Sequence, residues 1–177
     1  MPGPPPAVLI RLARLDDAEA TRAIYNREVL GATVTFDMVA RSLEDQRAWL
    51  VAHSGAHPAI VAETAAPTGG LVIVGFASLS PYRDRPAYAT SVENSVYVHH
   101  EWRGQGVGRL LLEELLELAV GHGFHAVIAR VVGGHDASIA LHHSAGFELV
   151  GIEREIGRKF GRWLDVALMQ RLLEPNR

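Results

Sequence analysis

Three glycines at alternate positions, Gly104, Gly106 and Gly108, give this sequence its clearest chemical signal. They follow a β-branched and aromatic run at residues 95–99, which predicts a strand, and they precede a leucine- and glutamate-rich run with one apolar helical face. The first turn of a helix presents backbone N–H groups without internal partners, and it carries the positive end of the helix dipole. Glycines let an anion approach these donors, and Arg103 and Arg109 flank them. The pattern therefore predicts a phosphate or pyrophosphate site.

Two other phosphate-binding loops fit this spacing less well. Gly-x-Gly-x-Gly differs from the dinucleotide fingerprint Gly-x-Gly-x-x-Gly, and no Gly-Lys-Ser/Thr follows, as a nucleoside triphosphate loop would require. A flexible helix start that binds no ligand stays open as an alternative.

Composition limits the classes of protein to consider. The 177 residues are 48% hydrophobic, which suits one globular domain, expected over residues 7–174 after a disordered, proline-rich segment at residues 1–6. The net charge of −3, from 17 basic and 20 acidic residues, favours neither nucleic acid nor a membrane surface as a partner. The absence of cysteine excludes disulfides, thiolate metal sites and a cysteine nucleophile. With no apolar run near the roughly 20 residues of a membrane span and no signal-peptide pattern, we expect a cytoplasmic protein.

Nine histidines raise the possibility of a metal site. They are scattered, and His99-His100-Glu101 is not the His-Glu-x-x-His pattern of zinc proteases. His142 and His143 are adjacent, so on a helix their side chains point about 100° apart. We expect no catalytic metal.

The remaining patterns predict a mixed sheet with helices on its faces, in the α/β (α+β) class. A strand, a helix and a second strand over residues 95–132 imply one parallel pair, whereas the hairpins imply antiparallel pairs. Residues 157–162, rich in glycine and basic side chains, are expected to form a linker between the last two strands. The expected strands cover residues 8–13, 59–64, 71–79, 95–99, 125–132, 147–156 and 163–172, and the expected helices end near Gly31, Ala52, Gly121 and Ser144.

This order of elements resembles the GCN5-related N-acetyltransferase (GNAT) family over nearly the whole chain. The hexapeptide Arg103-Gly104-Gln105-Gly106-Val107-Gly108 resembles the pyrophosphate loop of that family, and Val96-Tyr97-Val98 resembles the strand before it. Within the family, the chain is similar to the phosphinothricin and methionine sulfoximine/sulfone acetyltransferases. The resemblance implies a mixed, mostly antiparallel central sheet with about four flanking helices. The segments that carry the closer likeness are Asn26 with residues 33–36, 75–77, 85–88, 90–98, 137–142 with 146–147, and 159–165.

The resemblance also implies acetyl-CoA as cosubstrate and suggests which residues hold it. The backbone of Val96 and Val98, on either side of Tyr97, would pair with the pantetheine arm. The N–H of Val98 would donate to the thioester oxygen. His135 and Ser138 on the late helix are further expected contacts. The pyrophosphate would lie against Arg103, Gly104, Gln105, Gly106, Val107, Gly108 and Arg109.

Two residues are implied to be catalytic. Glu93, expected just before the central strand, stands where this group has the general base that removes a proton from the substrate ammonium. A solvated turn carboxylate is the alternative. His142 stands where many acetyltransferases have a tyrosine that protonates the departing thiolate, and an imidazole could do so near neutral pH. A polar histidine on a helix surface is the alternative there.

The substrate contacts follow from the same resemblance. Arg83 and Arg85 are expected near the carboxylate of an amino acid, which guanidinium groups bind through two parallel donors. Phe36, Tyr88 and the linker at residues 159–163 would wall the pocket, together with Glu93 at the amine, across a homodimer interface as in relatives.

The sequence therefore predicts an acetyl-CoA-dependent N-acetyltransferase that acts by direct transfer on the α-amino group of a small amino-acid-like substrate, of the phosphinothricin or methionine sulfoximine/sulfone type. Three alternatives remain. One is the same chemistry on another amine, such as a peptide N-terminus, an aminoglycoside or a polyamine. Another is a non-catalytic acyl-CoA-binding module, and the third is dinucleotide binding at the glycine loop.

Overall fold

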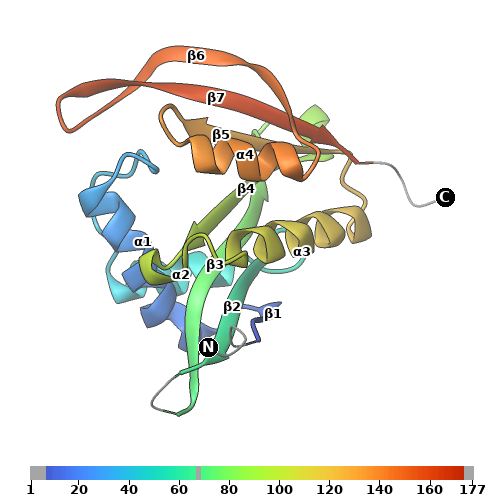
Figure 1. Ribbon diagram of the computed structural model, residues 1–177. Helices are drawn as coiled ribbons and strands as arrows, with labels where there is room; N and C mark the ends of the chain where they lie inside the picture. The colour runs from blue at the N-terminus through green and yellow to red at the C-terminus, as the bar shows by residue number, and fades with distance from the viewer. Residues whose placement is uncertain (1–6, 67–68, 174–177) are drawn as a thin grey trace, which may run out of the picture.

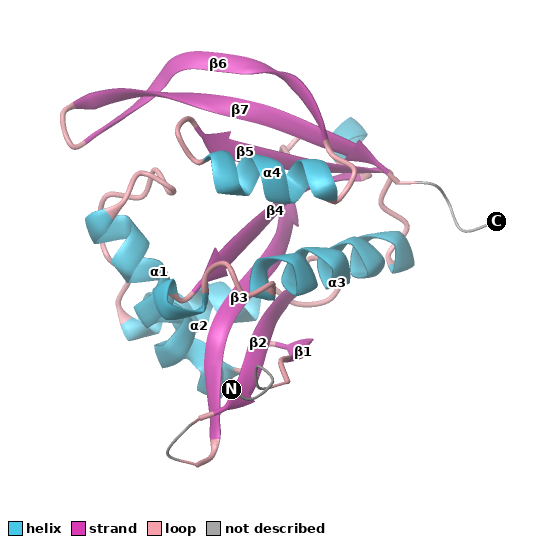
Figure 2. Ribbon diagram, in the orientation of Figure 1, coloured by secondary structure: helices cyan, strands magenta, loops and turns pink. Residues whose placement is uncertain are grey.

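A seven-stranded sheet runs through the molecule in the order β1-β2-β3-β4-β5-β7-β6 (Figures 1 and 2). The computed structural model describes residues 7–66 and 69–173, so the segment expected to be disordered, residues 1–6, lies outside the described residues. Neighbouring strands are antiparallel except for β4 and β5, which confirms the single parallel pair. The strands are β1 Leu9–Leu12, β2 Ala59–Ala65, β3 Leu71–Pro81, β4 Ser91–Val98, β5 Ala126–Val132, β6 Glu148–Lys159 and β7 Arg162–Leu172.

The α-helices of the described residues cover both faces of this sheet. Because side chains alternate along a strand, one face buries Val92 and Val127 against Leu111 and Leu115 of α3. The opposite face of β2 and β3 buries other residues against α1, in a separate apolar cluster. None of these helices has the length and apolarity that crossing a membrane requires. They are α1 Ala18–Gly31, α2 Leu43–Ala52, α3 Val107–Gly121 and α4 Asp136–Ser144.

The sheet opens between β4 and β5 (Figure 1). Their parallel pairing covers only Ser91, Val92 and Glu93, which lie opposite residues 126–128. Beyond Glu93 the two strands diverge, so β4 loses its partner on that edge. The divergence creates a gap in the middle of the sheet, beside the start of α3 and under α4.

The unpaired edge of β4 exposes particular backbone groups. The N–H of His99 donates to the carbonyl of Val74 at 2.9 Å, so His99 directs its backbone groups toward β3. Because these directions alternate along a strand, Val96 and Val98 direct theirs toward the gap. Arg103 supports this assignment, since its Nε donates to the carbonyl oxygen of Val98 at 3.3 Å. Among the described residues, β4 has no strand partner there beyond Glu93, and its N–H groups at Val96 and Val98 are available to an extended ligand.

The structure corrects two predicted boundaries. Strand β4 begins at Ser91, so Glu93 lies inside the strand and not just before it. The linker predicted at residues 157–162 is also wrong: β6 continues to Lys159 and β7 starts at Arg162, leaving a turn of Phe160 and Gly161. Both turn residues have positive φ, 49° and 74°, a backbone conformation that glycine adopts readily.

Candidate active site

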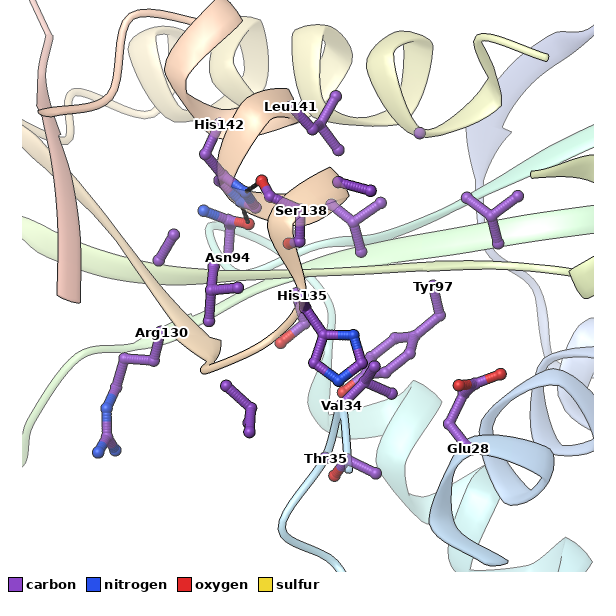
Figure 3. A pocket seen from close by; sticks show the side chains of 18 of the residues that line it. Glu28, Val34, Thr35, Asn94, Tyr97, Arg130, His135, Ser138, Leu141 and His142 are labelled. Atoms are coloured by element: carbon purple, nitrogen blue, oxygen red, sulfur yellow. Dashed lines mark hydrogen bonds between the residues drawn. The ribbon is translucent and has the colours of Figure 1, made fainter. Parts of the chain in front are cut away.

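A cavity of about 640 Å³ occupies the gap between β4 and β5 (Figure 3). Its walls come from these two strands, the loop between α1 and α2, the start of α3, and α4. The structure brings most of the predicted site residues to this one cavity. The predicted residues that do not line it are Gln105, Val107, Arg83, Arg85, Tyr88 and the stretch at residues 159–163.

The glycine loop forms one end of the cavity. Gly104 and Gly106 have φ values of 72° and 85°, which β-carbon-bearing residues rarely adopt, and they turn the chain into α3. The third glycine, Gly108, packs closely: a Cβ there would lie 3.4 Å from Leu141 Cδ2. The first N–H groups of α3 have no partner inside the helix, so this end of the cavity has the donors and the dipole of an anion site. Val107 is absent from the lining because its side chain is buried in the core.

The two arginines that flank the loop form different ion pairs, one with a buried carboxylate and one with an exposed carboxylate. Arg103 is paired with Glu28, whose side chain is 6% exposed and needs a counter-charge there. Arg109 instead makes an exposed pair with Glu113 at 2.7 Å, one helical turn along α3. Exposed pairs of this kind contribute little to stability, so Arg109 is the arginine free to turn toward a bound anion. Gln105 donates to the carbonyl of Glu101 at 2.8 Å, which holds the loop.

Glu93 lies where β4 and β5 separate, and it lines the cavity. Burial raises the pKa of this carboxyl group above its ordinary value of 4.5, the positive charge of Arg130 opposes the rise, and the negative charge of Glu153 adds to it. A carboxylate with a raised pKa is a better proton acceptor near neutral pH. The alternative of a solvated turn carboxylate is wrong, because Glu93 is partly buried within a strand.

His142 is buried, with 4% of its surface exposed, so the alternative of a surface histidine is wrong. Its Nδ1 lies 2.8 Å from the carbonyl oxygen of Ser138, and its Nε2 lies 3.0 Å from Oδ1 of Asn94 (Figure 3). Asn94 in turn donates from Nδ2 to the carbonyl of Ile128 in β5 at 3.2 Å. Through Asn94, His142 therefore ties α4 to the point where the two strands separate.

The proton state of His142 follows from these contacts. Both of its ring nitrogens face oxygen acceptors, and only a doubly protonated ring can donate a hydrogen bond to both. Burial acts in the other direction, because it lowers the pKa of the ring and favours the neutral form. To give a proton to a leaving group, Nε2 would have to leave Asn94. The role of His142 as an acid stays a prediction. Asn94 was not among the predicted site residues, because it is one of four polar residues in β4 and no local pattern distinguishes it.

The loop between α1 and α2 forms another wall of the cavity, and the contacts that anchor this loop were not predicted. Lys159 is only 2% exposed and donates from Nζ to the carbonyl of Thr35 at 2.9 Å, although burial lowers the pKa of its ammonium. Tyr25 bonds the hydroxyl of Thr35 at 3.1 Å, and Thr33 meets His135 Nε2 at 3.2 Å. These contacts fix the loop so that Phe36 faces the cavity.

The predicted substrate residues Arg83, Arg85 and Tyr88 lie on the loop between β3 and β4, outside the lining. The guanidinium of Arg83 lies 5.0 Å from the ring centre of Tyr82 and 5.9 Å from that of Tyr88. These three residues are exposed, and their contact with a substrate stays a prediction.

Among residues 7–66 and 69–173, one group of side chains has the residue types of a metal site. Ligand atoms of His99, His100 and Glu101 lie within 4.8 Å of one another. The three residues are consecutive, and His99 Nδ1 accepts a hydrogen bond from the N–H of Glu101 at 3.4 Å, as a helix cap does. The group lies outside the cavity, and the expectation of metal-free catalysis stays a prediction.

Comparison with known proteins identifies the class that this fold and cavity define. The chain belongs to the acetyltransferase (GNAT) family, whose model matches residues 21–147. An L-methionine sulfoximine/L-methionine sulfone acetyltransferase from Pseudomonas paraeruginosa is 38% identical over 169 residues, covering 95% of this chain and 96% of the relative.

Two solved structures resemble the chain over most of their length. A phosphinothricin acetyltransferase from Sinorhizobium meliloti, in complex with AcCoA, has a TM-score of 0.87 and 37% identity, covering 94% of this chain and 88% of that chain. A ribosomal-protein-alanine N-acetyltransferase from Brucella melitensis has a TM-score of 0.87 and 41% identity, covering 93% of this chain and 99% of that chain. The fold predicted from the sequence is therefore confirmed.

Proposed function

We propose that this protein transfers the acetyl group of acetyl-CoA to the α-amino group of a small amino-acid-like substrate, of the phosphinothricin or methionine sulfoximine/sulfone type. One observation carries the proposal. A single cavity joins an anion-binding helix start, an unpaired strand edge and a partly buried carboxylate with a raised pKa. The names of the relatives from Pseudomonas and Sinorhizobium support this class of substrate.

The chain offers acetyl-CoA a place along the cavity. The free N–H groups at the start of α3 and the side chain of Arg109 would hold the diphosphate. The unpaired backbone of Val96 and Val98 would pair with the amide groups of the pantetheine arm, as another strand would. That arrangement leaves the acyl end near Glu93, where β4 and β5 meet.

The chemistry then follows from these positions. Glu93 takes a proton from the substrate ammonium, directly or through water, and the neutral amine attacks the thioester carbonyl. An N–H group on the unpaired edge of β4 donates to the carbonyl oxygen as negative charge develops on it. With the acyl end near Glu93, the donor at Val96 lies nearer to that oxygen than the predicted donor at Val98, which is at the α3 end of the strand. The new C–N bond forms as the C–S bond breaks, and CoA leaves as a thiol once its sulfur is protonated, a step for which His142 is the candidate donor. Direct transfer is favoured because the chain has no cysteine to carry the acetyl group.

Acetylation of a peptide N-terminus is the second candidate, favoured by the name of the relative from Brucella. The experiment that separates the candidates measures release of CoA thiol with free amino acids, methionine sulfone, methionine sulfoximine, phosphinothricin, alanine-initiated peptides, aminoglycosides and polyamines. The proposal expects the highest kcat/KM with the amino acids and their sulfur and phosphorus analogues. A preference for peptides would replace it with the second candidate. Binding of acetyl-CoA without turnover on any amine would favour a non-catalytic module.

A homodimer and a cytoplasmic location are further parts of the proposal. Support for the dimer comes from edge strand β6 and its neighbour β7, where several large apolar side chains are at least half exposed: Leu149, Val150, Ile152, Ile156 and Trp163. Light scattering after size exclusion would distinguish a dimer from a monomer.

A substitution in β6 tests the role of Phe36 as a wall of the amine site. A Cβ on Gly157 would lie 2.4 Å from ring carbons of Phe36, so Gly157→Ala must push that ring from its position. We expect KM for the amine to rise about tenfold, because small displacements of positioning groups are costly, while KM for acetyl-CoA stays unchanged. Gly151→Ala, on the same strand with no atom within 4 Å of the added Cβ, is the matched control. Equal effects of the two substitutions would show that Phe36 does not shape the amine site.

A further inference from the structure

Three arginines line the cavity, and two of them belong to its glycine-loop end. Arg103 is paired with Glu28, and Arg109 lies on the first turns of α3. The third, Arg130, comes from β5. Figure 3 shows Arg130 and Glu28 at opposite sides of the view, so Arg130 lies far from the Arg103–Glu28 pair. The cavity therefore has a cation at the end that the cofactor loop does not reach.

Arg130 shares a face of the sheet with Glu93. Glu93 lies opposite Ile128 in the parallel pair, and side chains two residues apart on a strand point to the same face, so Arg130 follows Glu93 along the same wall. The two charges interact electrostatically: the positive charge of Arg130 lowers the pKa of the Glu93 carboxyl group, whereas burial raises it. A proton acceptor and a fixed positive charge thus stand next to each other.

The guanidinium of Arg130 has N–H donors that make no hydrogen bond to the described residues. Its Nη2 donates to Oε2 of Glu153 at 2.6 Å, across β7, and within the described part of the chain this is its one hydrogen bond. A guanidinium carries five N–H donors in a planar fork, so most remain available for a second acceptor. The two side chains are 38% and 35% exposed, which leaves the group open to the cavity while Glu153 holds its orientation.

We propose that Arg130 binds the carboxylate of the amino-acid substrate and thereby places its α-amino group at Glu93. This inference rests on the proposed function and makes it more specific. An α-amino acid carries its ammonium and carboxylate on one carbon, and the wall carries their two complements, Glu93 and Arg130, side by side. The predicted carboxylate ligands Arg83 and Arg85 lie outside the lining, whereas Arg130 is part of it.

The assignment makes Arg130 a specificity-determining residue. An amino acid would use the planar fork, whereas the corresponding amide or a peptide N-terminus offers no anion at this position. The wild-type protein should therefore prefer methionine sulfone to methionine sulfone amide by about tenfold or more in kcat/KM, as expected for loss of a charge-assisted hydrogen bond. This comparison needs no variant and is independent of any effect of mutation on folding.

Substitution supplies the second arm of the test. Arg130→Gln should raise KM for methionine sulfone about 10- to 100-fold while changing KM for the amide and for acetyl-CoA less than about threefold. Arg130→Lys keeps the charge but loses the fork, and it should fall between the wild type and Arg130→Gln. Arg154→Gln removes an arginine from the exposed surface of β6, outside the cavity lining, and serves as the control with unchanged constants.

The outcomes distinguish a failure of the role proposed for Arg130 from a failure of the proposed function. If the wild-type protein acetylates free amino acids but does not distinguish them from their amides, or if Arg130→Gln weakens both equally, the role of Arg130 is overturned and the proposed function stands. If the wild-type protein acetylates no amino acid at all, the proposed function itself is overturned. Preference for the acid that disappears in Arg130→Gln and persists in Arg154→Gln supports the inference.

Discussion

Glu93→Gln should lower kcat about 10²- to 10⁴-fold, the usual contribution of a positioned general base, and leave the affinity for acetyl-CoA unchanged. The amide has nearly the shape of the carboxylate but cannot accept the ammonium proton. The cofactor is expected to bind along Val96, Val98 and the start of α3, so removal of the charge at Glu93 does not touch that contact surface. Steady-state kinetics and calorimetric titration with acetyl-CoA measure the two effects separately.

The control is Glu117→Gln, which removes a carboxylate from the exposed side of α3 and should change neither quantity. The pH profile gives an independent check. Glu93 must be ionised to accept a proton, and burial raises its pKa above 4.5, so kcat/KM should fall as pH drops through this raised pKa. That acidic limb should disappear in Glu93→Gln. Full activity of the variant would remove Glu93 from the mechanism.

Leu111→Ala should lower the free energy of unfolding by about 2–5 kcal/mol, the range for truncation of a buried leucine. Leu111 is fully buried where α3 packs on the sheet, and it lies against Gly75 of β3. Its loss leaves a cavity under the first turns of the helix that carries the proposed anion site. Urea unfolding with and without acetyl-CoA measures the loss, and saturating ligand should restore part of it because only the folded state binds.

Leu110→Ala is the matched control for this substitution. Leu110 is the preceding residue on the same helix but is 42% exposed, so its truncation should cost less than about 1 kcal/mol. Equal losses for the two variants would contradict the described packing of α3.

The sequence predicted the architecture well because local patterns determine most of it. The alternate glycines, the apolar face of the following helix and the strand after it were enough to predict the parallel pair of β4 and β5 and the position of the loop. The resemblance of residues 85–98 to acetyltransferases predicted Glu93 as a site residue just before the central strand. The structure places Glu93 at the cavity but inside β4.

Residues whose roles depend on distant contacts could not be predicted in this way. Lys159 belongs to a glycine-rich basic stretch that suggests a solvated linker, yet pairing with β7 directs it inward to Thr35. Arg130 is the single polar residue of an apolar strand, and Asn94 is one of four polar residues in β4. Their positions at the cavity follow from the divergence of β4 and β5, which no local pattern records.

The most direct test of the account is a crystal structure of the protein with acetyl-CoA bound. The account predicts the diphosphate within hydrogen-bond distance of the N–H groups at the start of α3, the pantetheine arm paired with the backbone of Val96 and Val98, and the acetyl group beside Glu93. A cofactor bound at another surface, with the gap between β4 and β5 empty, would contradict the assignment of this cavity as the active site.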